Sequence, residues 1–179
     1  MTAPGSADIL ALLKQADRAL RERPAGAQPL HVVASIACFG EGDPSNLWTK
    51  PRMLDLPLVQ PTRAQLRVIS AAIDLAHQCG LTIRDAELKI HTVSARGVEH
   101  VCEGQATLNY TDGSVTISLD VDEPLSMILV CALHELQHAS DFWERTQADA
   151  IELERRARRF VGHAVGERLV AELLAAEET

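Results

Sequence analysis

The chain has 179 residues, of which 46% are hydrophobic and only 3% aromatic, so its core must be built mainly from aliphatic side chains. Its formal net charge of −8 gives no attraction to nucleic acid phosphates or anionic lipid headgroups, so neither nucleic acid nor membrane is expected as a partner. No apolar run approaches the ~18 residues of a membrane span, and the N-terminus has no signal-peptide pattern, so a cytoplasmic location is expected.

The first 61 residues are predicted to contain one helix, one strand and a long loop. Residues 7–22 carry an apolar stripe at helical spacing and, with the linker that follows, form an N-terminal segment over residues 1–29. Residues 30–39 are rich in branched side chains, which favours a strand. Residues 40–61 hold four prolines and two glycines and predict a long loop, a feature that is often functional inside a compact domain.

The middle of the chain predicts one helix followed by three strands. The helix covers residues 62–80, with Thr62 as its N-cap and Gly80 as its C-terminal stop. Strand patterns follow at 86–93, 105–111 and 114–121. Asp112-Gly113, between the last two strands, is typical of a tight hairpin.

Two helices are predicted to complete the chain. The first opens at Glu123-Pro124 and runs to about residue 143, and the last covers about residues 147–176. The order helix, strand, helix, three strands and two helices predicts an α+β fold, with helices packed on one small mixed sheet. A single domain over residues 1–179 is expected, with its catalytic core at about 86–176.

The next-to-last helix contains the motif His-Glu-x-x-His, formed by His134, Glu135 and His138. Side chains four residues apart lie on the same helix face, so two imidazoles can meet one Zn²⁺ at about 2.0–2.1 Å. Glu135 is turned aside by about 100°, which places it beside the metal as a general base rather than as a ligand.

The surroundings of the motif favour a metal. The helix sequence "PLSMILVCALHELQHASDF" is apolar on nearly all sides before His134, as in a buried helix. Two histidines and a glutamate buried there would each carry a desolvation cost unless they were paired. Bound Zn²⁺ would supply that pairing.

The proposed third ligand is Glu154 on the last helix. The apolar face of that helix consists of Ala150, Leu153, Ala157, Phe160, Val161 and Ala164. Glu154 lies within this face, whereas Glu152 lies on the opposite side and is interpreted as a solvated charge. The alternative for Glu154 is a salt bridge to a nearby arginine.

His134-Glu135-x-x-His138 followed by Glu154-x-x-Ala157 resembles the gluzincin branch of the zincin metallopeptidases, over about residues 105–165. In that group the third ligand is a glutamate on a helix behind the active-site helix. The resemblance implies a minimal zincin-like fold, with an active-site helix and a C-terminal backing helix against the sheet. It also implies that strand 114–121 is a sheet-edge strand to which substrate adds as a further strand. The short interval from His138 to Glu154 and the absence of NExxSD depart from the large gluzincins.

Other residues and other families offer alternatives to this assignment. Asp141 shares the helix face of the histidines and is an alternative third ligand, or an acceptor for a ligand imidazole; Glu144 ranks after it. The metzincin pattern fails because Asp141 replaces its glycine and Glu144 its last histidine. Peptide deformylases also use His-Glu-x-x-His, but in "VCEGQ" the cysteine, Cys102, precedes Glu-Gly instead of following it.

The remaining candidate residues are single side chains without ligand spacing. Tyr110 is a possible transition-state group, with a buried structural role as the alternative. The other histidines, expected to be surface or core residues, are His31, His77, His91, His100 and His163. The cysteines, expected to be buried free thiols, are Cys38, Cys79, Cys102 and Cys131. The basic run "RRARR" at 155–159 is expected to be a solvated face, or a contact surface for an acidic partner.

The predicted function is zinc-dependent hydrolysis of a peptide or protein substrate, with Glu135 as general base. The alternative is a structural or regulatory zinc-binding domain that acts through a protein partner. The fourth position on the metal separates the two, because a catalytic site keeps it open for water and a structural site closes it with a protein ligand such as Asp141 or Cys102.

Overall fold

The computed structural model describes residues 11–16, 18, 53–98 and 104–177. The predicted strand at 30–39, most of the predicted loop at 40–61, and Cys38, Cys102, His31 and His100 lie outside these residues. The described elements after the helical residues 11–16 are η3 (Met53–Asp55), α2 (Arg63–Gln78), β1 (Leu88–Val93), β2 (Gly104–Leu108), β3 (Val115–Asp120), α3 (Leu125–Trp143) and α4 (Ala150–Glu177). This order confirms the predicted α+β class.

The three described strands form one mixed sheet in the order β1-β3-β2. β1 pairs with β3 in parallel, and β2 pairs with β3 in antiparallel orientation. The prediction that strand 114–121 lies at the sheet edge is therefore wrong, since β3 is the central strand. The hairpin places β2 on one side of β3. β1 pairs with the other side of β3, although the two strands are far apart in the sequence.

The predicted hairpin is confirmed, but β2 ends three residues earlier than expected. The chain reverses over residues 109–114, where the Asn109 N–H donates to the Ser114 carbonyl at 2.9 Å. Gly113 has a φ of 75°, the left-handed conformation that favours glycine. Tyr110 consequently lies in the turn and not in a strand.

Helix α2 begins and ends where the sequence predicts. Thr62 forms a capping box with Gln65, and Gly80 follows the helix with a φ of 81°. The Gln65 side chain also donates to the Val121 carbonyl at 2.8 Å, which ties the first turn of α2 to the end of β3.

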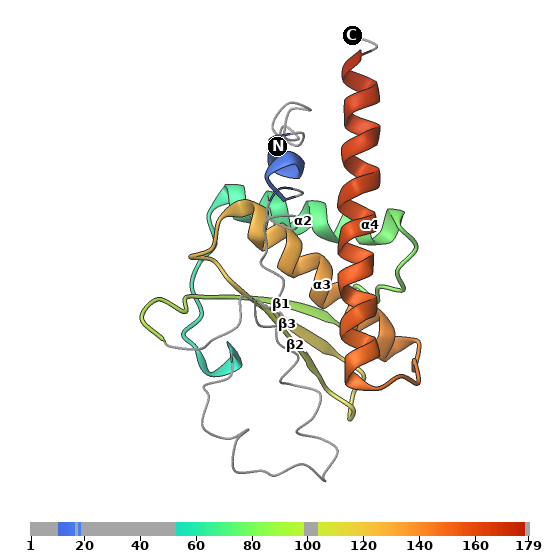
Figure 1. The fold of residues 1–179 in the computed structure, drawn as a ribbon. Coiled ribbons are helices and arrows are strands. Elements are labelled where there is room, and N and C mark those ends of the chain that lie inside the picture. The colour runs from blue at the N-terminus through green and yellow to red at the C-terminus, as the bar shows by residue number, and fades with distance from the viewer. Residues whose placement is uncertain (1–10, 17, 19–52, 99–103, 178–179) are drawn as a thin grey trace.

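Helix α3 is the centre of the molecule. Fifteen of its 19 residues are buried, because α2, the sheet and α4 all pack against it (Figure 1). Its largest fully buried side chains are Ile128, Leu133, Leu136, His134 and Val130. Each buried aliphatic side chain contributes about 1.5–3 kcal/mol, so this packing fixes the position of the motif that α3 carries.

A tight reversal connects α3 to α4. The Thr146 N–H donates to the Asp141 carbonyl at 2.9 Å and the Arg145 N–H to the Phe142 carbonyl at 3.1 Å, while Arg145 has a φ of 55°. These bonds form a Schellman motif, with an arginine in the position that glycine usually takes. The chain thereby turns back and lays α4 along α3 (Figure 1).

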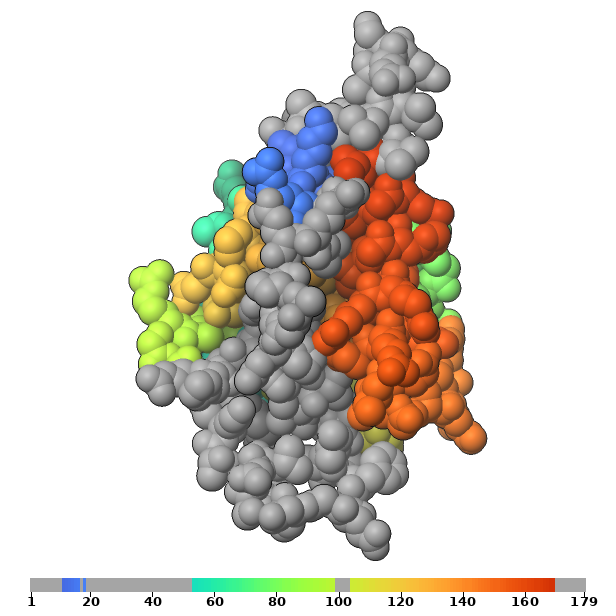
Figure 2. All heavy atoms as spheres, viewed as in Figure 1, coloured from blue at the N-terminus to red at the C-terminus, as the bar shows by residue number. Residues whose placement is uncertain are grey.

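Helix α4 begins at Ala150, a few residues after the predicted start. Its predicted apolar face is confirmed, because Ala157, Val161 and Ala164 are buried. Further along α4, the same face belongs to the core that includes Leu13 from the helical residues 11–16. In Figure 2 residues 11–16 adjoin α4. In the described part of the chain, no helix has both the length and the hydropathy needed to cross a membrane.

Candidate metal centre

Three side chains from two helices converge at the contact between α3 and α4. The Nε2 atoms of His134 and His138 are 3.1 Å apart. The Oε2 atom of Glu154 lies 3.3 Å from His134 Nε2 and 3.7 Å from His138 Nε2. The structure thus brings together the three residues that the sequence predicts as zinc ligands. Among the described residues, no other group of three or more His, Cys, Asp or Glu side chains has this geometry.

The three ligand atoms fit one zinc ion. A tetrahedral ion with bonds of about 2.0–2.1 Å has ligand atoms about 3.3–3.4 Å apart, and the observed separations of 3.1, 3.3 and 3.7 Å lie around that value. Glu154 Oε2 is buried without a hydrogen-bond partner in the described residues. A buried, unsatisfied carboxylate oxygen beside two imidazole nitrogens is the donor set that Zn²⁺ prefers.

The charges at this position also favour a cation. Burial raises the pKa of Glu154, but contacts with His134, His138 and Arg158 lower it by more, so the carboxyl group stays ionised. Burial lowers the pKa of His138, but Glu154 and other carboxylates raise it by more. The imidazole therefore faces a negative potential, in which a proton or a metal ion is stabilised.

Glu135 lies beside this group without belonging to it. Its Oε2 accepts a hydrogen bond from the backbone N–H of Ala106 on β2 at 2.7 Å. Burial raises the pKa of Glu135, and the nearby His134 and His138 oppose that rise only in part. A carboxylate with a raised pKa can take and release a proton closer to neutral pH than an ordinary glutamate, which suits a general base.

Gly104 and Ala106 also adjoin this site, although neither was predicted from the sequence. A Cβ atom on Gly104 would lie 3.2 Å from Cys131 Cβ and 3.3 Å from Glu135 Cγ. A larger residue would require Cys131 or Glu135 to shift by a few tenths of an ångström, so glycine favours the close approach of β2 to α3 that brings the Ala106 N–H within reach of Glu135. A glycine at the start of a strand is the one signal that points to such an approach.

Asp141, the alternative ligand, is engaged elsewhere. It is 3% exposed, and its Oδ1 accepts from Arg156 Nη2 at 2.8 Å and from Gln137 Nε2 at 3.1 Å. Asp141 thus forms an ion pair with Arg156 on α4. Glu144, the other alternative, lies on the exposed end of α3 and accepts from the Thr82 hydroxyl at 2.6 Å. Neither residue belongs to the three-residue group.

Tyr110 does not have the buried structural role that was its predicted alternative. It is 54% exposed, so it is not a buried structural residue. Its ring lies edge-on to Phe142, with centroids 5.0 Å apart. Phe142 is one helical turn after His138, so Tyr110 lies at the end of α3. The role of Tyr110 as a transition-state group stays a prediction.

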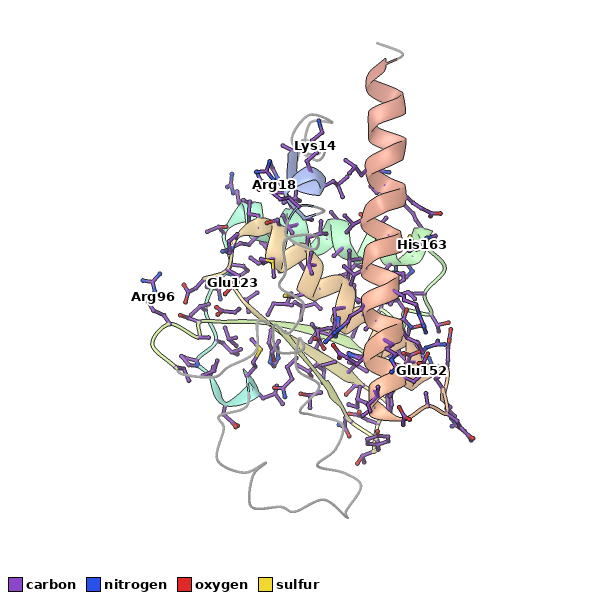
Figure 3. The ribbon with its side chains drawn as sticks, in the orientation of Figure 1. Lys14, Arg18, Arg96, Glu123, Glu152 and His163 are labelled. Atoms are coloured by element: carbon purple, nitrogen blue, oxygen red, sulfur yellow. The ribbon has the colours of Figure 1, made fainter. Side chains whose placement is uncertain are left out.

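The remaining described histidines and cysteines do not belong to the three-residue group. His77 pairs with Asp85 and His163 with Glu167, and all four side chains are exposed. Figure 3 shows His163 further along α4 than Glu152, which stands at the start of that helix. Neither Cys79 nor Cys131 forms a disulfide; Cys131 is buried as expected, whereas Cys79 is only partly buried.

The two glutamates at the start of α4 provide a test of the third ligand. Glu154 is 13% exposed in its side chain and faces the histidines, whereas Glu152 is 39% exposed and pairs with Arg159. We expect Glu154→Ala to weaken zinc binding by roughly 10²-fold, the share of one ligand in a zinc site, and Glu152→Ala to leave it unchanged. A zinc titration of both variants measures this. Equal behaviour would contradict the assignment, and a loss on Asp141→Ala alone would move it to Asp141.

Comparison with known proteins adds no name to this site. No family model, curated protein or solved structure matches the chain.

Proposed function

We propose that this protein is a zinc-dependent metallopeptidase with a minimal zincin-like fold, in which His134, His138 and Glu154 hold the metal. The observation that carries the proposal is the convergence of His134 Nε2, His138 Nε2 and Glu154 Oε2, with separations of 3.1 to 3.7 Å. Three protein ligands are typical of catalytic zinc sites, in which a fourth position remains for water or substrate. Structural sites more often have four.

The roles of the chain's own groups follow from their positions. When bound, Zn²⁺ supplies Lewis acidity, which makes water more acidic and a carbonyl more electrophilic. Glu135 takes the proton of the attacking water and passes it to the leaving amine. The Ala106 N–H holds one oxygen of Glu135 at 2.7 Å, so the other oxygen is left for this proton transfer.

The neighbouring strand supports a peptide as the substrate. Within the described residues β2 is an edge strand, and it lies against α3 beside Glu135. An extended peptide can bind such an edge as an added strand, which would lay its backbone past the metal centre. We therefore assign to β2 the substrate-binding role that the sequence analysis gave to residues 114–121. The expected cytoplasmic location remains part of this proposal.

The proposal predicts one zinc per chain and a chelator-sensitive peptidase activity. The purified protein is analysed for metal and screened against a peptide library at neutral pH, with chelator and then with added zinc. Cleavage that is lost with chelator and restored by zinc is the expected result. Absence of metal after refolding with zinc would contradict the proposal. Four protein ligands at the metal and no cleavage would favour the structural or regulatory zinc domain.

A further inference from the structure

The basic run Arg155–Arg159 divides into two functionally different pairs of arginines. Arg155 and Arg159 are each 66% exposed in their side chains and pair with Glu152 on their own helix. Arg156 and Arg158 instead contact groups at the metal centre or next to it. The predicted solvated face fits Arg155, Arg159 and also Arg158, whose side chain is 50% exposed, whereas Arg156 is partly buried against α3.

Arg158 holds the outer oxygen of Glu154. Its Nε donates to Glu154 Oε1 at 3.0 Å, whereas Oε2 of the same carboxylate faces the two imidazoles. One oxygen of the carboxylate therefore binds a guanidinium, and the other faces the position of the metal. A free glutamate carboxylate can present both oxygens to one ion.

Arg156 fixes the helix that carries Glu154. Its Nε and Nη2 both donate to Asp141 Oδ1, at 3.0 and 2.8 Å. Because Asp141 belongs to α3, this ion pair joins α4 to α3 two residues beyond Glu154. The backbone of Glu154 is therefore positioned independently of Arg158, which leaves Arg158 to orient the carboxylate itself.

We propose that Arg158 is a positioning residue that limits Glu154 to one coordinating oxygen and so keeps a coordination position open at the metal. This inference rests on the proposed zinc site. An open position, occupied by water, is what distinguishes a catalytic from a structural zinc site. A second oxygen from Glu154 would bind beside that water, crowd its position and raise the coordination from four to five. Charged groups that hydrogen-bond a ligand commonly control its orientation in this way.

The test uses the full chain loaded with Co²⁺ in place of Zn²⁺, because the visible absorption of Co²⁺ weakens as its coordination number rises from four to five. We expect Arg158→Ala to lose absorption intensity relative to wild type. X-ray absorption of the zinc-loaded variant is expected to show one additional oxygen at the metal. Arg158→Lys, which keeps a cationic donor, is expected to restore most of the wild-type spectrum. Arg159→Ala removes the same charge one residue away and is expected to leave the spectrum unchanged.

The outcomes separate this inference from the proposed function. Circular dichroism checks that each variant is folded, and Arg158→Gln serves as a second variant if the alanine variant is not. A folded Arg158→Ala or Arg158→Gln protein with the wild-type spectrum and coordination number would overturn the role of Arg158, while the zinc site would stand. Failure of the wild type itself to bind either metal would instead overturn the proposed function.

Discussion

Replacing His138 with alanine is expected to abolish stoichiometric zinc binding and to leave the fold intact. Its Nε2 is one of the three converging ligand atoms, 3.1 Å from that of His134. Zinc sites with four ligands bind with about 10–16 kcal/mol, so one ligand accounts for roughly 3 kcal/mol, or about 10²-fold in affinity. His134→Ala is expected to have the same effect on zinc, with a larger loss of stability because its ring is fully buried and would leave a cavity.

Elemental analysis and thermal unfolding together measure this effect. Zinc that binds only the folded state stabilises it by about 2.7 kcal/mol at a free concentration of 100 Kd, so the Tm of the wild type should rise with added zinc. At the same zinc concentration the Tm of His138→Ala should rise much less, because a site about 10²-fold weaker is then only about half occupied. His163→Ala is the matched control, since His163 is an exposed histidine on α4 that pairs with Glu167. Full zinc occupancy in His138→Ala would remove this residue from the site.

Glu135→Gln is expected to lower the rate of peptide hydrolysis by about 10²–10⁴, the contribution of a positioned acid–base group. Glutamine has nearly the same shape, and its amide oxygen can still accept the hydrogen bond that the Ala106 N–H donates to Glu135 at 2.7 Å. It cannot take a proton from water. Because Glu135 is not one of the three ligand residues, zinc content should be unchanged.

The stability of the Glu135→Gln protein should not fall, because a neutral amide costs less to bury than a carboxylate. The same substitution at Glu144, which lies on the exposed end of α3, is the control and should change neither hydrolysis nor zinc content. Rates are measured with whichever peptide the library screen identifies. Equal rates for wild type and Glu135→Gln would show that another group is the base.

The helices and the main candidate residues could be predicted because helical periodicity is local. His134 and His138 are one turn apart on any helix, and the apolar run before them indicates burial. The same periodicity places Glu154 among Ala157, Val161 and Ala164, which are buried as predicted. Thr62 and Gly80 marked the ends of α2 for a similar reason, since caps depend on a few neighbouring residues.

Tertiary structure alone decided which strand lies at the sheet edge and what surrounds each ligand. The pattern of β3 shows that it is a strand, but its central place depends on β1, whose pairing crosses a long stretch of chain. In the same way, the bond from Ala106 to Glu135 and the ion pair of Arg156 with Asp141 join residues on different elements, so both depend on how those elements pack. The sequence by itself therefore determined which residues can bind a metal, through spacing within single helices. Only the packing of α3 against β2 and α4 decided which groups hold those residues in place.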